Sequence, residues 1–164
     1  MRRINKIIIH CSYSRWGNLA EITKWHTDPP PKGNGWSRVG YHKVILNAYP
    51  TFNNLKQNLP DPKSDGEVQR GLFDEVPGIH VRGHNHDSLG ICYIGGMTFD
   101  DITEAQYITL LFECEKWVNN YDLTYMDVYG HNEFDSSKSC PNLDIEQFRS
   151  DLRDLIFQIK YFTL

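Results

Sequence analysis

The sequence predicts an α/β fold: a single domain over residues 1–164 in which helices flank a central mixed β-sheet. Short apolar runs typical of buried strands alternate along the chain with stretches whose apolar residues recur at helical spacing. The chain has 164 residues, the size of one ordinary domain. Its 40% hydrophobic and 23% charged residues are typical of globular rather than disordered proteins.

The N-terminal segment predicts two strands with a helix between them. Residues 6–12 are mostly apolar and predict a buried first strand. Asn18, followed three residues later by Glu21, has the spacing of a helix start. The prolines at 29–31 end that helix because proline cannot continue it. Residues 39–47 predict the second strand.

The middle of the chain predicts a long polar excursion. Residues 48–66 are polar, contain three prolines and predict a surface loop. After this loop, residues 67–70 predict a short returning strand and residues 72–76 a short helical turn. Residues 90–95 predict a buried third central strand.

The C-terminal part predicts two helices on either side of a fourth strand. Thr103 and Gln106 have the spacing of a capping box. The apolar residues that follow recur at i, i+3, i+4 and i+7, which predicts an amphipathic helix. Residues 126–129 predict the fourth strand, and residues 144–160 predict the last helix.

Composition argues against several classes of protein. The formal net charge is −4 and the basic residues are scattered, so we expect no nucleic-acid partner. No stretch approaches the roughly 20 apolar residues of a membrane span, so we expect no membrane insertion. The basic residues 1–5 precede no apolar signal core, so we expect synthesis in the cytoplasm without a signal peptide. Four cysteines without paired spacing disfavour a disulfide framework.

Three residues that are far apart in the sequence form a candidate metal-ligand set. His10 ends the first predicted strand, and His131 and Cys140 lie in a polar segment after the fourth. Two imidazoles and one thiolate suit zinc, and three protein ligands leave a fourth position open, as in catalytic sites. The chain has seven histidines, and the spacing from His131 to Cys140 matches no zinc-finger pattern. Spacing alone therefore does not separate ligands from surface or core residues.

Five short motifs occur in a fixed order along the chain. They are Ile9-His10-Cys11-Ser12, Val39-Gly40-Tyr41-His42, the segment from Ile79-His80 through Asn85 to Ile91, Gly130-His131, and Lys138-Ser139-Cys140-Pro141. Together they resemble the type 2 N-acetylmuramoyl-L-alanine amidases. That superfamily includes small phage amidases, called phage lysozymes, and the animal peptidoglycan-recognition proteins. The resemblance runs from about residue 6 to residue 157 and implies the same fold for this chain.

The resemblance also implies an activity and the residues that perform it. It implies hydrolysis of the amide bond between N-acetylmuramic acid and L-alanine in peptidoglycan, with one Zn²⁺ ion held by His10, His131 and Cys140. The catalytic tyrosine of the family corresponds to Tyr41, and the lysine two residues before the third ligand corresponds to Lys138. The residues alone favour a half-buried strand aromatic for Tyr41 and a solvated loop charge for Lys138.

Other polar residues have more than one interpretation. The resemblance implies that His80 and Asn85 bind substrate, and it marks residues 49–65 as an insertion relative to the phage pattern. Trp36 fits either a groove or the core, and His26 near a helix end predicts a surface residue stabilised by the helix dipole. Three further cysteines are predicted to be small buried hydrophobes: Cys11, Cys92 and Cys114.

These observations predict an endolysin of phage or prophage type: a monomer whose partner is peptidoglycan, as a muramyl peptide, and which reaches the cell wall after release or lysis. One alternative is a non-catalytic peptidoglycan-binding module of the same fold, which would lack a ligand or the lysine. A second alternative is a protein stabilised by a structural zinc ion. It would close the fourth position with a protein ligand, for which His84 and His86 are the candidates.

Overall fold

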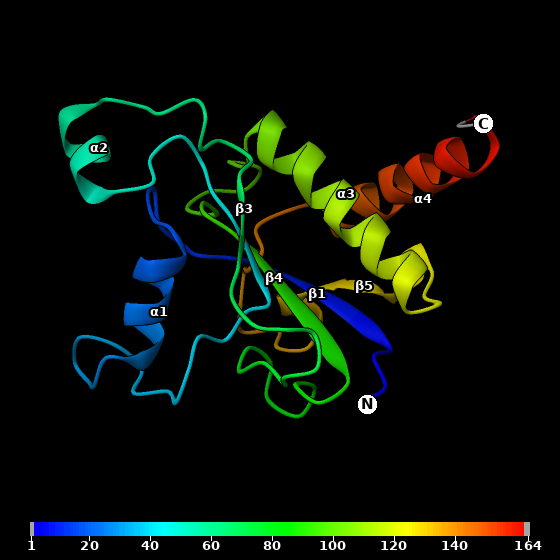
Figure 1. Cartoon of the computed structure of the whole chain (residues 1–164), viewed down its shortest axis with the longest axis horizontal. Coiled ribbons are helices and arrows are strands. Elements are labelled where there is room, and N and C mark those ends of the chain that lie inside the picture. Colours follow the sequence, from blue (N-terminus) through cyan, green and yellow to red (C-terminus); the bar gives the residue numbers. More distant parts are fainter. Residues whose placement is uncertain (1, 163–164) are drawn as a thin grey trace.

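A computed structural model describes residues 2–162 and contains a five-stranded sheet with helices packed against it (Figure 1). The strand order is β3-β2-β4-β1-β5. All neighbours are parallel except β2 and β3, so the sheet is mixed. The strands are β1 Lys6–Cys11, β2 Lys43–Ile45, β3 Val68–Arg70, β4 Ser88–Tyr93 and β5 Val128–Gly130.

The helices are α1 Leu19–Thr27, α2 Phe52–Gln57, α3 Glu104–Asn120, α4 Ile145–Phe162 and the 3-10 helices η1 Tyr125–Asp127 and η2 His131–Glu133. Four of these helices lie in the connections between strands, and η2 and α4 follow the last strand, β5. Within residues 2–162, no helix combines the length and the apolar character that crossing a bilayer requires. The predicted fold class, an α/β domain with a central mixed sheet, is confirmed.

Successive side chains of a strand point to opposite faces of the sheet, and the two faces of this sheet carry different residues. One face of β1 and β4 carries large apolar residues such as Ile9 and Ile91, which pack with Trp117 of α3 and Phe148 of α4 in the larger core. The other face carries a smaller cluster in which Ile22 of α1 packs with residues from β2 and its surroundings. The helices α3 and α4 lie together on the first face in Figure 1. The second face keeps room for polar side chains.

Register brings two strand ends together at one edge of the sheet. Strands β4, β1 and β5 run parallel, so their C-terminal ends meet at that edge. Ile9 lies opposite Gly130, and His10 lies opposite Cys92. The residue that follows Gly130 is therefore delivered next to His10.

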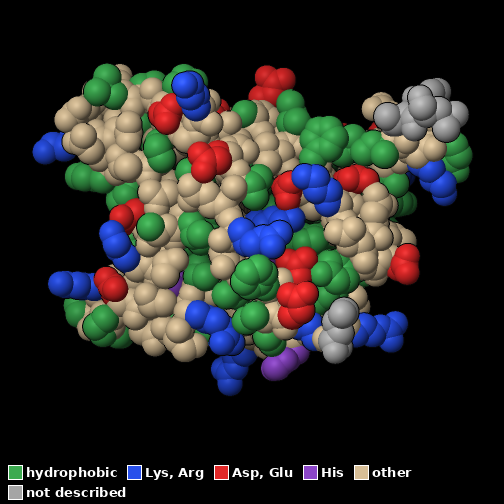
Figure 2. Space-filling model, viewed as in Figure 1, with side chains coloured by type: hydrophobic (Ala, Val, Ile, Leu, Met, Phe, Trp, Pro, Cys, Tyr) green, Lys and Arg blue, Asp and Glu red, His purple; other side chains and the backbone are tan. Residues whose placement is uncertain are grey.

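Charged side chains of both signs are interleaved on the face shown in Figure 2. Glu113 of α3 pairs with Lys43 of β2 and with Lys116, each at 2.6 Å. The Lys43 ammonium also lies 3.9 Å from the centre of the Trp117 ring. Lys43 is thus almost buried with its charge compensated, as a buried cation requires.

Most predicted elements are confirmed, including the capping box in which Thr103 and Gln106 exchange hydrogen bonds. The second strand is much shorter than residues 39–47, because only Lys43–Ile45 finds a partner in β3. The predicted loop at 48–66 contains α2, which was missed because its six residues bury none of their side chains and show no apolar period.

Two further boundaries differ from the predictions. Residues 72–76 form turns instead of a helix. The predicted strand at 126–129 begins only at Val128, because Thr124 and Asp127 cap the 3-10 helix η1 immediately before it. Neither difference moves the strand end that carries His131.

One buried amide fastens α3 to the sheet. Gln106 is fully buried, and its Nε2 donates to the carbonyls of Ile94 at 2.9 Å and Ile45 at 3.3 Å. Its Oε1 accepts from the Thr103 amide at 3.1 Å. The same side chain therefore caps the helix and pairs carbonyls where β2 and β4 end.

We expect Gln106→Leu to lower the free energy of unfolding by about 1–3 kcal/mol, because the Ile94 carbonyl loses its donor, whereas the Ile45 carbonyl still accepts from the Ile94 amide at 2.9 Å. Urea titration followed by circular dichroism measures this loss. Gln158→Leu is the matched control, because Gln158 is exposed on α4 and should change stability by less than about 0.5 kcal/mol. Equal effects of the two substitutions would contradict the assigned role of Gln106.

Candidate metal centre

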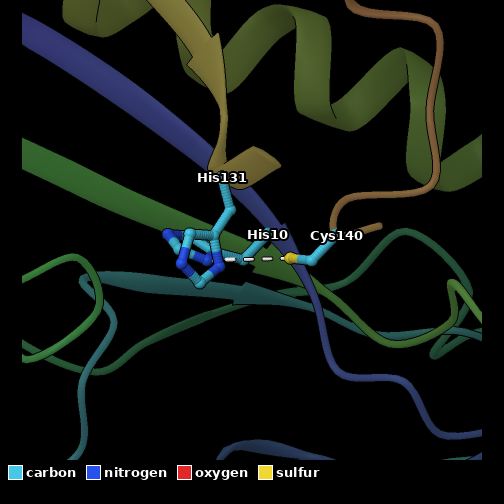
Figure 3. A group of neighbouring side chains, drawn as sticks. All are labelled: His10, His131 and Cys140. Carbon is cyan, nitrogen blue, oxygen red and sulfur yellow. Dashed lines mark hydrogen bonds between the residues drawn. The ribbon is translucent and has the colours of Figure 1, made fainter. Parts of the chain in front are cut away.

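His10, His131 and Cys140 converge at the edge where β1 and β5 end (Figure 3). One potential ligand atom from each residue lies within 4.8 Å of the other two. His10 Nδ1 is 3.8 Å from Cys140 Sγ, and the two imidazole centres are 4.7 Å apart. Donors around a tetrahedral zinc ion lie about 3.4–3.7 Å apart, given zinc–nitrogen and zinc–sulfur lengths of about 2.1 and 2.3 Å. The three side chains are therefore spaced to hold one such ion.

Backbone contacts hold the Cys140 loop against the sheet. The Asn132 amide donates to the Cys140 carbonyl at 2.8 Å, so the third ligand is tied to the turn that carries His131. The Cys11 amide donates to Cys140 Sγ at 3.3 Å. An amide aimed at the sulfur stabilises negative charge on it, which suits a thiolate ligand.

Burial sets the protonation of the three side chains. It lowers the pKa of His10 well below its usual value, with smaller effects from neighbouring histidines, and it also lowers the pKa of His131. Both rings are therefore neutral at neutral pH and keep a lone pair for a metal. A hydrogen bond with Cys11, together with burial, raises the pKa of the Cys140 thiol. Its proton leaves when a cation replaces it, so the donor set fits zinc.

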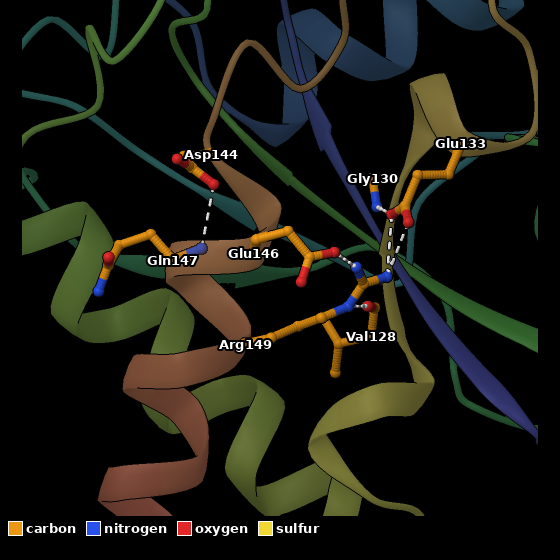
Figure 4. Close-up of polar contacts among 7 residues, drawn as sticks. All are labelled: Val128, Gly130, Glu133, Asp144, Glu146, Gln147 and Arg149. Atoms are coloured by element: carbon orange, nitrogen blue, oxygen red, sulfur yellow. Dashed lines mark hydrogen bonds and ion pairs between the residues drawn. The ribbon is translucent and has the colours of Figure 1, made fainter.

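An arginine from α4 supports the turn that carries His131 (Figure 4). Arg149 is buried, and its Nε donates to the Val128 carbonyl at 2.8 Å. Its Nη2 pairs with Glu133 at 2.8 Å, and the second Glu133 oxygen accepts from the Gly130 amide at 2.6 Å. His131 is thus flanked on both sides by backbone that Arg149 and Glu133 hold.

The sequence reasoning missed Arg149, although a signal was present. Arg149 lies four residues after Ile145 and three before Leu152, in the apolar stripe of α4. A charged residue in such a stripe is buried only when it is paired. Its position therefore pointed to an ion pair, but nothing in the sequence identified Glu133 as the partner.

Tyr41 lies beside the three candidate ligands. Its ring centre is 5.0 Å from that of His10 and 5.1 Å from that of His26. Burial raises the pKa of Tyr41 well above its usual value, and the nearby thiols of Cys92 and Cys140 add to the effect. The phenol therefore keeps its proton at neutral pH and can act as a hydrogen-bond donor.

Lys138 lies in the same loop as Cys140 and is exposed. Its amide donates to the Asp135 carbonyl at 3.0 Å, which fixes the backbone at this point. Its positive charge contributes to the lowered pKa of His131, after burial. Within residues 2–162, its ammonium group has no hydrogen-bond or ion-pair partner and interacts electrostatically with the Asp135 carboxylate, so the charge is available to a ligand.

His80 and Asn85 are placed differently from each other. His80 is buried, and its Nδ1 lies 3.0 Å from His10 Nε2. Asn85 Oδ1 accepts from the amides of His80 and Val81 at 2.8 and 2.9 Å. Both residues also line a surface hollow of about 300 Å³, together with Trp36, and His80 connects this hollow to His10. Their contact with substrate stays a prediction.

Two other histidines lie close to this region. The predicted surface position of His26 is wrong: the residue is buried, and its Nδ1 accepts from the Gly40 amide at 3.0 Å because the loop after α1 folds back over it. His42 packs against Trp117, and its Nδ1 accepts from the Gly90 amide at 2.9 Å. Burial lowers the pKa of each to about 4.

The remaining candidates do not join the metal group. Among the described residues, the group contains three side chains, and neither His84 nor His86 is one of them. The predicted burial of three cysteines is confirmed, and all four cysteines are free thiols: Cys11, Cys92, Cys114 and Cys140.

Comparison with known proteins gives consistent matches. The family model described as N-acetylmuramoyl-L-alanine amidase matches residues 1–143. The endolysin of Escherichia phage T7 is 29% identical over 150 residues, which cover 87% of this chain and 83% of the phage protein.

Solved structures share the fold. The N-acetylmuramoyl-L-alanine amidase LysC from Clostridium intestinale has a TM-score of 0.66 at 24% identity, covering 92% of this chain and 86% of that chain. The ectodomain complex of peptidoglycan recognition proteins LCa and LCx with tracheal cytotoxin has a TM-score of 0.61 at 23% identity, covering 86% and 77%.

Two substitutions at carboxylates that pair with Arg149 test whether Glu133 stabilises the turn that carries His131. We expect Glu133→Gln to lower the free energy of unfolding by about 1–2 kcal/mol, because it removes a charged partner of Arg149 that also holds the Gly130 amide. Glu146→Gln should change stability by less than about 0.5 kcal/mol, because the Glu146 side chain is 82% exposed and, among the described residues, bonds only to Arg149. Thermal and urea unfolding measure both, and the reverse order would contradict the assigned support.

Buried histidines predict loss of stability in acid. The pKa of His42 is about 4 in the folded protein and about 6.5 when unfolded, so the unfolded state binds more protons between these values. Stability should therefore fall as pH drops through this window, by about 1.4 kcal/mol per pH unit from this residue. His42→Gln should remove that share of the slope. An unchanged slope in His42→Gln would refute the assignment.

Proposed function

This chain belongs to the N-acetylmuramoyl-L-alanine amidase family, and we propose that it performs the family's hydrolysis with one zinc ion held by His10, His131 and Cys140. The observation that carries the proposal is the convergence of these three donors, with ligand atoms within 4.8 Å of one another. Their chemistry supports zinc, because two neutral imidazoles and one thiol that can ionise are ligands that zinc prefers.

The bond that is cut joins N-acetylmuramic acid to L-alanine in bacterial peptidoglycan. A related structure binds tracheal cytotoxin, a peptidoglycan fragment, which supports a muramyl peptide as the substrate here. We place its peptide in the hollow lined by Trp36, His80 and Asn85, which reaches the candidate ligands through the contact of His80 with His10. The similarity to phage endolysins supports action on the cell wall after release or lysis, and we propose that the protein acts as a monomer.

Tyr41 and Lys138 have separate roles in the proposed amide hydrolysis. When bound in such an open site, zinc activates water and polarises a carbonyl. Tyr41, which keeps its proton, donates a hydrogen bond toward the reacting carbonyl or orients the attacking water. Lys138 brings a positive charge to the rim of the site and stabilises the negative charge that develops on the carbonyl oxygen.

Two alternatives remain distinct in chemistry. A non-catalytic peptidoglycan-binding module would not need Lys138 or the third ligand, and this chain has both. A structural zinc site would close with a fourth protein ligand, whereas the group of donors among residues 2–162 has three members. Both observations support the catalytic proposal.

Purified cell walls and zinc removal test the proposal. We expect the chain to release new L-alanine amino termini, to lose this activity in a chelator and to regain it with added zinc. His131→Ala should be inactive while it still folds. Wall binding without new amino termini would favour the binding module. Zinc-dependent folding without wall binding would favour the structural protein.

The two assisting residues are tested by paired substitutions. We expect Tyr41→Phe and Lys138→Met each to reduce kcat by roughly 10²-fold or more, because each removes a group that acts on the reacting carbonyl. Zinc affinity and stability should stay close to wild type. Lys160→Met, at an exposed position on α4, controls for the loss of a lysine charge. Wild-type kcat in either variant would remove that residue from the mechanism.

A further inference from the structure

A chain of hydrogen bonds leads from His10 into the protein, on the side of the ring away from Cys140. His10 Nε2 lies 3.0 Å from His80 Nδ1, and His80 Nε2 lies 3.3 Å from Ser88 Oγ. The Ser88 hydroxyl donates to the His84 carbonyl at 2.6 Å. His10, His80 and Ser88 are buried, which leaves bulk water little access to these groups.

The His84 carbonyl, at the far end of this row of hydrogen bonds, fixes the donor and the acceptor in each of them. A carbonyl can only accept, so the Ser88 proton points to His84 and leaves Oγ to accept. His80 Nε2 must then carry the proton that Ser88 accepts. A neutral imidazole has one donor and one acceptor, so His80 Nδ1 accepts from His10 Nε2. His10 Nδ1 is consequently left with a free lone pair, and it is the nitrogen that faces Cys140 at 3.8 Å.

The His80 ring is held rigidly in this position. A Cβ on Gly90 would approach three atoms of the His80 ring to 2.9 Å, so the ring lies directly against the backbone of β4. Asn85 Oδ1 accepts from the His80 and Val81 amides and fixes the backbone from the other side. A ring clamped in this way can set the orientation of its partner.

We propose that His80 is a positioning residue of the metal centre: it holds His10 in the tautomer and orientation that present Nδ1 to the ion. The proposal rests on the zinc site proposed above and assigns His80 a role separate from substrate contact. Both ring nitrogens of His80 are already bonded within the protein, so the ring has no free polar atom to offer a muramyl peptide. Removing such an outer partner typically weakens metal binding by about 10–100-fold.

The tautomers can be read directly on the wild-type protein. Nitrogen-15 NMR of labelled imidazoles should show His10 and His80 both protonated at Nε2 in the metal-free protein. The pattern should persist with zinc bound, with His10 Nδ1 shifted by the metal. A His80 ring protonated at Nδ1 would reverse the chain and overturn the proposal. This measurement requires no substitution and therefore does not depend on a variant that folds.

Substitutions at His80 test the consequence for the metal. We expect His80→Leu to bind zinc about 10–100-fold more weakly in competition with a chromophoric chelator, because His10 loses its acceptor. His80→Asn should recover most of this loss, because Asn Oδ1 can accept at the place of Nδ1. Ser88→Ala should give a smaller loss. His42→Gln removes another buried histidine without a bond to a ligand, so it should lose stability but keep zinc affinity.

The outcomes separate this proposal from the proposed function. Wild-type zinc affinity in folded His80→Leu, with a raised KM for a muramyl peptide, would make His80 a substrate contact and overturn the proposal. A wild-type chain that binds no zinc would refute the proposed function, while the NMR tautomers would still decide the direction of the His10–His80 bond. If His80→Leu does not fold, the tautomers and the Ser88→Ala affinity decide the question.

Discussion

The parallel pairing of β1 with β4 and β5 is the constraint on which the site depends. Because parallel strands end at the same edge, this pairing delivers His10 and the residue after Gly130 to one point. The large apolar face beneath α3 and α4 pins the register, since a slip of one residue would turn His10 into the core. Hydrophobic packing on one face therefore positions metal-binding chemistry on the other.

Hydrogen bonds and an ion pair fix the positions of the histidines on the polar face of the sheet. Arg149 and Glu133 fix the backbone around His131. The hydrogen bonds that run from His10 through His80 to the His84 carbonyl fix the ring of His10. Buried neutral imidazoles are stable only when their donors and acceptors are paired. The same pairing prepares lone pairs for a cation, so what stabilises the fold also organises the centre.

Apolar periodicity and capping signals were sufficient to predict the sheet, α3 and α4, because these elements bury long stripes. They could not reveal α2, which buries nothing, or the short length of β2, which depends on a distant partner. The ordered motifs pointed to the three donors. The role of His80 toward His10 and the burial of His26 depend on loops folding back over the sheet, which local sequence does not encode.

The central claim is that two imidazoles and one sulfur hold a single zinc ion whose fourth position is not a protein side chain. X-ray absorption at the zinc edge, on the protein loaded with one equivalent, tests it most directly. The account predicts one sulfur at about 2.3 Å, two imidazole nitrogens at about 2.1 Å and one further light atom from water. A second sulfur, a third imidazole, or failure to retain zinc at this stoichiometry would contradict it.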